Sequence, residues 1–237
     1  MLKLDEVTVR FGGLTAVNRV SLDVAEGGIV GLVGPNGAGK TTLFNAISGL
    51  VNPKSGAIRF ADSDISRWPQ HRRARAGLGR TFQIPQPLAQ LTVRENLIVA
   101  QRFGAGAVEM TRIDELLALV NLSGKADRDA ATALSLSELK ALEVAKAMAT
   151  NPQLLLLDEV LAGLESASKR AFSDMLRKVH ERFRVGLLII EHDIETISAL
   201  CPRVVVLNFG EVIADGTPDQ VFRDARVIES YTGHGGE

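Results

Sequence analysis

Residues 34–42 combine glycines, a lysine and two hydroxyl side chains in a spacing suited to binding phosphate. Gly34-Pro35-Asn36-Gly37-Ala38-Gly39-Lys40-Thr41 fits the pattern G-x-x-x-x-G-K-[ST] at every position, and Thr42 follows it. Glycines let the backbone turn so that successive N–H groups point at phosphate oxygens. Lys40 is expected to hold the β- and γ-phosphates of a nucleotide, Thr41 to bind Mg²⁺, and Thr42 to contact the α-phosphate. The alternative, a glycine-rich turn with no ligand, does not account for the lysine and hydroxyl groups.

Two acidic residues end a run of four leucines. Leu154–Leu157 has the length and character of a buried strand, and Asp158 and Glu159 follow it directly. Acids at the carboxyl end of a buried strand are expected to face a site rather than the core. Alone, such a pair is more often a solvated loop, but together with a phosphate-binding loop it predicts chemistry on the nucleotide. Asp158 is then expected to hold Mg²⁺ through water, and Glu159 to polarise the water that attacks the γ-phosphate.

Strands that alternate with helices are expected to position these two segments. Ile29–Val33 is a short apolar strand that leads into the glycine-rich loop, and a helix from Lys40 to Gly49 follows. Further helices are expected at 138–150 and 168–183, and further strands at 154–157, 186–190 and 204–207. This alternation predicts an α/β fold with a mostly parallel sheet. Apolar residues at period two over 2–11 and 20–24 add an antiparallel β-subdomain near the N-terminus.

The segment from about 64 to 132 has a different character. It is richer in Arg, Gln and Ala, and its apolar spacing predicts helical pieces rather than strands. Thr92 and Glu95 form a capping box that predicts the start of one helix, and glycines at 104 and 106 are expected to end it. We therefore expect one domain over 1–237, with an α/β core in 1–82 and 150–237 and an inserted helical part at about 83–149.

Composition limits the classes of function. A net charge of −1 gives no electrostatic footprint for general nucleic-acid binding, so no nucleic-acid partner is expected. The single cysteine, Cys201, lies in an apolar stretch and is expected to be an inert buried thiol in a reducing compartment. No apolar run approaches the roughly 20 residues that a membrane span needs, and no secretory signal is visible. A soluble protein is expected, with Gly233–Glu237 as a frayed tail.

Over essentially its whole length the chain resembles the ATP-binding cassette (ABC) family, whose members are P-loop ATPases. Gln83 stands ahead of the helical part, as that family's Q-loop does, and Leu134–Glu138 occupies the signature position. Ala162–Glu165 resembles the D-loop, and His192 resembles the switch histidine. Phe11 falls where the family stacks an aromatic ring on adenine. Each of these is weak alone, because Gln83 could be a loop amide, His192 a hydrogen-bonded loop histidine and Phe11 a core residue.

Within that family the likeness is to the ATPases of bacterial branched-chain (hydrophobic) amino-acid importers. It rests on Phe11–Val17 and Gly79–Gln83, and on the segments 213–218 and 227–231. The resemblance implies an ATPase that uses ATP and Mg²⁺ and couples hydrolysis to uptake of branched-chain amino acids or related small solutes. It assigns catalysis to Glu159, His192 and Gln83, and Mg²⁺ contacts to Thr41, Gln83 and Asp158. It also assigns Phe11 and Val17 to nucleotide binding.

The resemblance also implies partners. The ATPase would form a nucleotide-sandwich dimer with a second ABC ATPase subunit, which can be the same chain or a different one. Two membrane permease subunits would hold the dimer at the cytoplasmic face of the membrane as a peripheral component. A periplasmic or extracellular solute-binding protein would deliver the solute. We expect Ile84–Leu88, called the docking segment below, to contact the membrane subunit.

The signature region departs from the family pattern Leu-Ser-Gly-Gly-Gln. Ser137 replaces the second glycine and Glu138 the glutamine, whereas Ser135 is retained. Ser135 and Ser137 are expected to contact the nucleotide that the second subunit holds. However, Ser135-x-x-Glu138 is also a capping box, and its carboxylate competes with phosphate for the same helix terminus. A fixed anion there is expected to cost on the order of 1 kcal/mol, which predicts a weakened composite site.

Two other functions fit parts of the sequence. A degenerate cassette could hold ATP for dimer structure without hydrolysing it, and the altered signature favours this reading. An ABC ATPase outside transport, acting in DNA repair or on the ribosome, usually carries long coiled coils or two fused cassettes. This chain has one cassette and no heptad run.

Overall fold

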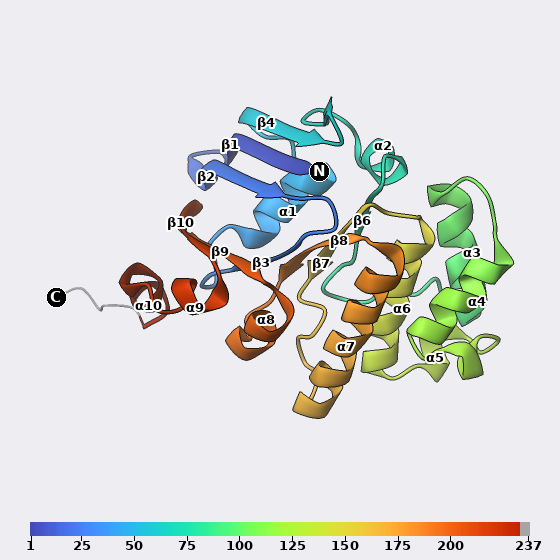
Figure 1. Cartoon of the computed structure of the whole chain (residues 1–237). Helices are drawn as coiled ribbons and strands as arrows, with labels where there is room; N and C mark the ends of the chain where they lie inside the picture. The colour runs from blue at the N-terminus through green and yellow to red at the C-terminus, as the bar shows by residue number, and fades with distance from the viewer. Residues whose placement is uncertain (233–237) are drawn as a thin grey trace. The chain divides into compact units, whose positions relative to one another are not determined.

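The computed structural model describes residues 1–232, so the expected frayed tail at 233–237 lies outside the described residues. The chain forms two compact units (Figure 1). Unit 1 comprises Met1–Gln70 and Gly186–Glu237, and unit 2 comprises His71–Val185. Within residues 1–232, no helix is both long and apolar enough to cross a membrane.

Unit 1 begins with an antiparallel sheet. Its strands are β1 (Leu2–Phe11), β2 (Leu14–Val24), β4 (Ser55–Phe60) and β5 (Ser63–Asp64), in the order β2-β1-β4-β5. Apolar side chains on alternate positions of β1 and β2, such as Leu2 and Leu22, are buried. This period of two is the signal that predicted antiparallel strands here, and the prediction is confirmed.

The second sheet of unit 1 is mostly parallel. Strand β3 (Ile29–Val33) pairs in parallel with β8 (Gly186–Ile190) and β9 (Arg203–Asn208), and β10 (Glu211–Gly216) pairs antiparallel with β9. The helices of this unit are α1 (Lys40–Ser48), α8 (Ile194–Leu200), α9 (Pro218–Val221) and α10 (Ala225–Thr232). The α/β class with a mostly parallel sheet is confirmed.

Helix α8 packs closely on β3. A Cβ atom on Gly31 would lie 3.1 Å from the Ile197 side chain and 3.3 Å from Cys201 Sγ, so a larger residue would require these neighbours to shift by a few tenths of an ångström. Cys201 is buried, and burial raises the pKa of its thiol to about 12. The thiol therefore stays protonated, which agrees with the expected inert, buried cysteine.

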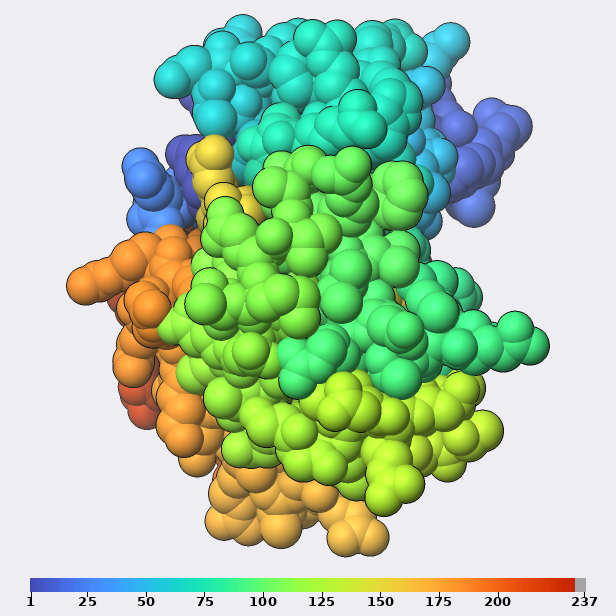
Figure 2. Space-filling view, turned by 90° about the vertical axis from the view of Figure 1, so that its right-hand side faces the viewer, coloured from blue at the N-terminus to red at the C-terminus, as the bar shows by residue number. Residues whose placement is uncertain are grey.

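Unit 2 is built from two parallel strands and a set of helices. The strands are β6 (Leu78–Arg80) and β7 (Leu154–Asp158). The helices are α2 (Gln70–Arg75), which starts at the unit boundary, α3 (Val93–Gly104), α4 (Met110–Leu119), η1 (Ser123–Lys125), α5 (Ala130–Ala133), α6 (Leu136–Ala149) and α7 (Ser166–Phe183). Helices α3, α4 and α6 pack against one another, and the green surface in Figure 2 belongs mainly to this helical segment.

One expectation for the segment 64–132 is wrong. Helical pieces rather than strands were expected there, but β6 is a strand within it, and β5 ends at its first residue. A three-residue strand that contains Gly79 is too short to show a period of two. Its extended conformation depends on pairing with β7, some 76 positions later in the chain, as in Leu78 opposite Leu154. The capping box of Thr92 and Glu95 at the start of α3 is confirmed.

Candidate nucleotide site

The loop between β3 and α1 needs glycine at two positions. Gly34 has a φ of 145° and Gly39 a φ of 100°, and residues other than glycine rarely adopt backbone conformations with such positive φ values. A Cβ atom on Gly34 would lie 2.0 Å from the Leu207 carbonyl oxygen, and one on Gly39 would lie 2.3 Å from the Ala16 carbonyl oxygen. The loop therefore sits directly against β9 and β2, which hold it in a fixed shape. We call residues 34–42 the cradle.

The cradle concentrates positive potential at the start of α1. Lys40 is 6% exposed, and its Nζ donates hydrogen bonds to the carbonyl oxygens of Gly34 (2.7 Å) and Pro35 (2.9 Å). The helix has Gly39 at its N-cap, with no side-chain cap and no acidic residue in its first turn. The N–H groups of that turn and the Lys40 ammonium group thus suit an anion. Thr41 is exposed and Thr42 is half-buried at the same helix end.

His192 follows β8 at the same sheet edge as the cradle. Leu32 of β3 pairs with Ile190 of β8 in parallel register, so the segments that follow these two strands leave the sheet side by side. His192 is exposed two positions after Ile190, and Asp193 caps α8 by accepting a hydrogen bond from Thr196 N–H. Unit 1 therefore brings the cradle and the predicted switch histidine to one edge of its sheet.

Phe11 and Val17, which the resemblance assigns to nucleotide binding, differ in exposure. Phe11, at the end of β1, is 50% exposed, so it is not the core residue that was considered as an alternative. Val17 is fully buried and pairs with Val9 across the β1–β2 ladder. Its side chain belongs to the core of the sheet, so any contact of Val17 with a nucleotide falls to its main chain.

In unit 2, the pairing of β6 with β7 places an arginine beside the first acidic residue. Arg80 pairs with Leu156 in the ladder, and its Nη2 donates a 3.0 Å hydrogen bond to Asp158 Oδ2. The two side chains are only 7% and 6% exposed. Burial lowers the pKa of Arg80, whereas the charge of Asp158 raises it. Arg80 belongs to the Gly79–Gln83 motif, and its partner 78 positions away could not be read from the sequence.

The second acidic residue contacts the predicted Q-loop residue. Gln83 Nε2 donates a 2.7 Å hydrogen bond to Glu159 Oε2, because both residues follow the carboxyl ends of paired strands. Glu159 has φ of 51°, an uncommon conformation for a residue with a Cβ atom, at a cost of order 1 kcal/mol. Its backbone conformation turns the chain sharply at the end of β7, and its side chain is half-buried.

Replacing Arg80 by Met is expected to lower the free energy of unfolding by about 3 kcal/mol, because the substitution removes one partner of a buried ion pair. Arg177→Met is the matched control: Arg177 pairs with Asp174 at 2.7 Å, but the side chains are 39% and 63% exposed. An exposed pair contributes about 0–1 kcal/mol. Urea unfolding of the purified chain measures both. Equal losses for the two variants would contradict the structural role of the Arg80–Asp158 pair.

The signature region forms the predicted capping box at the start of α6. Ser135 N–H and Oγ each donate a 2.8 Å hydrogen bond to Glu138 Oε2, and Ser137 Oγ lies 3.2 Å from Ser135 Oγ. Lys125 forms an ion pair with Glu138 at 2.7 Å. The hydrogen bond between these two side chains is the main reason that the pKa of Glu138 lies below its usual value. Lys125 was not foreseen, and it offsets part of the repulsion expected between Glu138 and a phosphate.

Each unit offers an oxygen ligand of the kind that Mg²⁺ takes together with phosphate and water. Among residues 1–232, no group of three or more His, Cys, Asp and Glu side chains could hold a metal ion. Mg²⁺ is usually bound by one or two protein oxygen ligands together with substrate phosphates and water. The exposed hydroxyl of Thr41 in unit 1 and the carboxylate of Asp158 in unit 2 are ligands of that kind.

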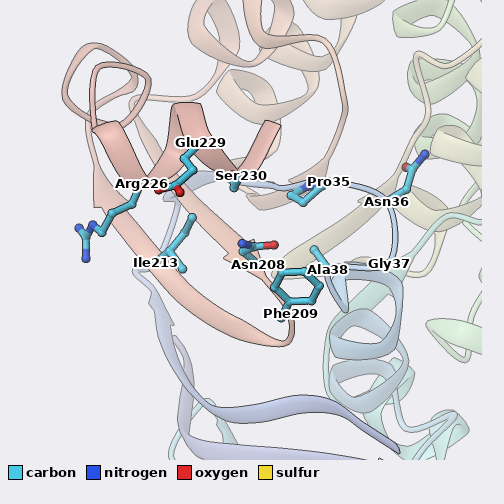
Figure 3. Close-up of a pocket in the computed structure, with 10 residues that line it drawn as sticks. All are labelled: Pro35, Asn36, Gly37, Ala38, Asn208, Phe209, Ile213, Arg226, Glu229 and Ser230. Carbon is cyan, nitrogen blue, oxygen red and sulfur yellow. The ribbon is translucent and has the colours of Figure 1, made fainter. Parts of the chain in front are cut away.

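A cavity of about 530 Å³ opens beside the cradle in unit 1 (Figure 3). Cradle residues 35–38, the β9–β10 turn and α10 line it, and the Phe209 ring lies beside Ala38. Burial raises the pKa of Tyr231 in α10, and the nearby main chain of Gly34 lowers it in part. In the sequence, residues 227–231 carry only the family resemblance. The contact of α10 with the cradle is therefore a feature that only the structure revealed.

The chain is similar to ABC transporter ATP-binding proteins over nearly its whole length. The ABC transporter family matches residues 17–162, and the family described as branched-chain amino acid ATP-binding cassette transporter matches residues 211–237. The high-affinity branched-chain amino acid transport ATP-binding protein BraF of Pseudomonas aeruginosa is 38% identical over 98% of both chains. The lipopolysaccharide export system ATP-binding protein LptB of Haemophilus influenzae is 36% identical, over 98% of this chain and 97% of that one.

A solved structure supports the fold. An ATP-binding cassette of an ABC transporter, in its ADP conformation, superposes with a TM-score of 0.88 at 28% identity over 99% of both chains. The C-terminal match at 211–237 separates this chain from ABC ATPases in general, and the similarity to BraF agrees with it. The chain therefore belongs to the ABC transporter family as one of its ATPase subunits, in the branch of the branched-chain amino acid transport proteins.

Proposed function

We propose that this chain hydrolyses MgATP to drive the uptake of branched-chain amino acids or related small solutes through a membrane permease. The observation that carries the proposal is the combination of a complete cradle with the Gln83–Glu159 pair at the end of β7. The solute class rests on the identity with BraF and on the family match at 211–237. Neither the degenerate cassette nor the non-transport ATPase is favoured by these observations.

The chemistry that we assign to each unit follows from its main-chain amides and its polar and charged side chains. The cradle amides and Lys40 hold the triphosphate, and Phe11, being half-exposed, stacks on the adenine. Glu159 accepts a hydrogen bond from the attacking water and polarises it, while Gln83 holds the Glu159 carboxylate in place. His192 supports the γ-phosphate. Mg²⁺, when bound by Thr41, Gln83 and Asp158, neutralises charge that develops on the phosphates.

The partners follow from the same assignment. Ser135 and Ser137 at the exposed start of α6 would contact the nucleotide held by a second ABC ATPase subunit, in a sandwich dimer. Residues 83–149 would act as the helical part of a single ABC ATPase domain. The docking segment would contact a permease subunit, and two permease subunits would hold the dimer at the cytoplasmic face of the membrane. A solute-binding protein outside the membrane would deliver the solute.

The proposal is tested by purifying the chain with its cognate permease subunits and reconstituting the complex in liposomes. We expect ATP turnover to rise when the cognate solute-binding protein is present with leucine, isoleucine or valine. We also expect the solute to accumulate only in liposomes in which the complex is oriented for uptake, and not in controls with the opposite orientation. ATP turnover without any solute response to amino acids or small amides would contradict the transport assignment while leaving the ATPase assignment intact.

Restoring the family signature is expected to raise ATP turnover. The double substitution Ser137→Gly, Glu138→Gln removes the carboxylate that now accepts both Ser135 hydrogen bonds. It frees the Ser135 hydroxyl for phosphate and removes a repulsion of the order of 1 kcal/mol, which corresponds to about a fivefold effect. Steady-state ATPase activity of the assembled complex measures this. Unchanged turnover and unchanged ATP-driven dimerisation would show that the Lys125 ion pair already neutralises Glu138.

A further inference from the structure

The main chain of Gln86 is held by an ion pair on the signature helix α6. Glu143 Oε1 accepts a 3.0 Å hydrogen bond from Gln86 N–H, and Lys146 Nζ donates a 2.7 Å hydrogen bond to the Gln86 carbonyl oxygen. Glu143 and Lys146 also contact each other at 2.7 Å, and their side chains are 8% and 16% exposed. The two side chains therefore bind both polar groups of one residue of the docking segment. We call this arrangement the Gln86 clamp.

The docking segment is anchored a second time at its end. Asn96 of α3 is fully buried, and its Oδ1 accepts a 2.8 Å hydrogen bond from Leu88 N–H. Its Nδ2 donates a 2.9 Å hydrogen bond to the Thr92 carbonyl oxygen. Meanwhile Ile84 is 72% exposed and Leu88 is 39% exposed. The segment thus presents apolar side chains to solvent while its main chain is fixed to the helices beneath it.

Helix α6 connects the clamp to two further loops of unit 2. Near its start, Lys140 Nζ donates hydrogen bonds to the carbonyl oxygens of Ala162 (2.6 Å) and Glu159 (3.2 Å). At its N-cap stands Ser135 of the signature. A 14-residue helix is about 21 Å long and bends little, so a displacement at one end is carried to the other.

A buried ion pair is a poor source of stability, since its desolvation offsets most of its attraction unless further hydrogen bonds are satisfied. Here the further hydrogen bonds go to a loop rather than to the helix itself. A buried polar network whose hydrogen bonds are all satisfied rigidifies the segments that it joins and favours one arrangement of them. The clamp therefore fixes the docking segment to α6 in one register.

We infer that the Gln86 clamp is the contact through which a permease bound to the docking segment moves α6, and with it Ser135 and the loop after Glu159. This inference rests on the proposed function, because it assumes that Ile84–Leu88 meets a permease. Glu143 and Lys146 act as positioning residues: they touch neither nucleotide nor reacting water. Their loss is expected to uncouple the permease from hydrolysis without weakening the cradle, which lies in unit 1.

The test uses the complete reconstituted complex with the variants Glu143→Gln and Lys146→Met. We expect basal ATP turnover and ATP affinity within about twofold of the parent, whereas the solute-stimulated increment falls at least fivefold. Lys146→Arg retains a donor and a charge and is expected to restore most of the stimulation. Asp174→Asn is the matched control, since Asp174 forms an i,i+3 ion pair with Arg177 at 2.7 Å on the exposed face of α7.

A second measurement reports on the contact itself. Hydrogen exchange of the Gln86 amide is expected to be slow in the parent complex and at least tenfold faster in Glu143→Met, with the exchange of α1 unchanged. If Glu143→Met fails to fold, Glu143→Gln provides the same measurement with a weaker acceptor. Full solute stimulation in Glu143→Gln and Lys146→Met would overturn the inference. Absence of stimulation in the parent complex would instead overturn the proposed transport function.

Discussion

Replacing Glu159 by Gln is expected to reduce ATP turnover by at least about a hundredfold, because a positioned general base contributes about 10²–10⁴-fold. Glutamine has the same shape and retains the oxygen that accepts the hydrogen bond from Gln83 Nε2. It also keeps the Cβ atom and the positive φ of residue 159, so the turn after β7 is preserved. ATP binding should therefore persist while the attack of water is lost.

The measurement is steady-state phosphate release by the assembled complex, with ATP binding followed separately by a fluorescent ATP analogue. Glu181→Gln is the control, since Glu181 is an exposed glutamate on α7 in the same unit. We expect the Glu159→Gln dimer to persist in ATP, whereas the control behaves as the parent. Turnover within threefold of the parent would exclude Glu159 as the group that polarises the water.

Replacing Lys40 by Met is expected to weaken ATP binding about a hundredfold. A hydrogen bond to a charged group contributes about 1.5–3 kcal/mol, and Lys40 is placed to donate more than one to the phosphates. Its Nζ lies inside the cradle, where it now donates to the carbonyl oxygens of Gly34 and Pro35. The substitution therefore removes the ammonium group and also two contacts that shape the loop.

Two controls separate loss of charge from loss of the fold. Lys54→Met removes an exposed lysine of the same unit and should leave ATP affinity unchanged. Thermal unfolding of Lys40→Met without nucleotide shows whether the cradle alone or the whole unit is affected. Titration with the fluorescent analogue gives the dissociation constant. A change below threefold, with an intact unfolding transition, would contradict the role of Lys40 in holding phosphate.

Much of the site was predictable from the sequence because its parts are local. The cradle needs glycines at 34 and 39 and a lysine at the helix start, and these requirements act within nine consecutive residues. The capping boxes at Thr92 and Ser135 likewise join side chains three positions apart. Long strands and helices can be recognised in the sequence because their apolar residues recur with periods of two and 3.6 residues, respectively. Patterns of this range are visible in one sequence.

The partners of those residues were decided by tertiary structure. Arg80 and Asp158 are 78 positions apart, Gln83 and Glu159 are 76 apart, and Gln86 and Glu143 are 57 apart. Spacing along the chain carries no information on which of many arginines or glutamates will meet. Strand β6 shows the physical reason: three residues have no period of their own and become a strand only because β7 supplies their hydrogen bonds. The sequence alone predicted which chemical groups would bind and hydrolyse a nucleotide, and only folding decided how those groups are held and connected.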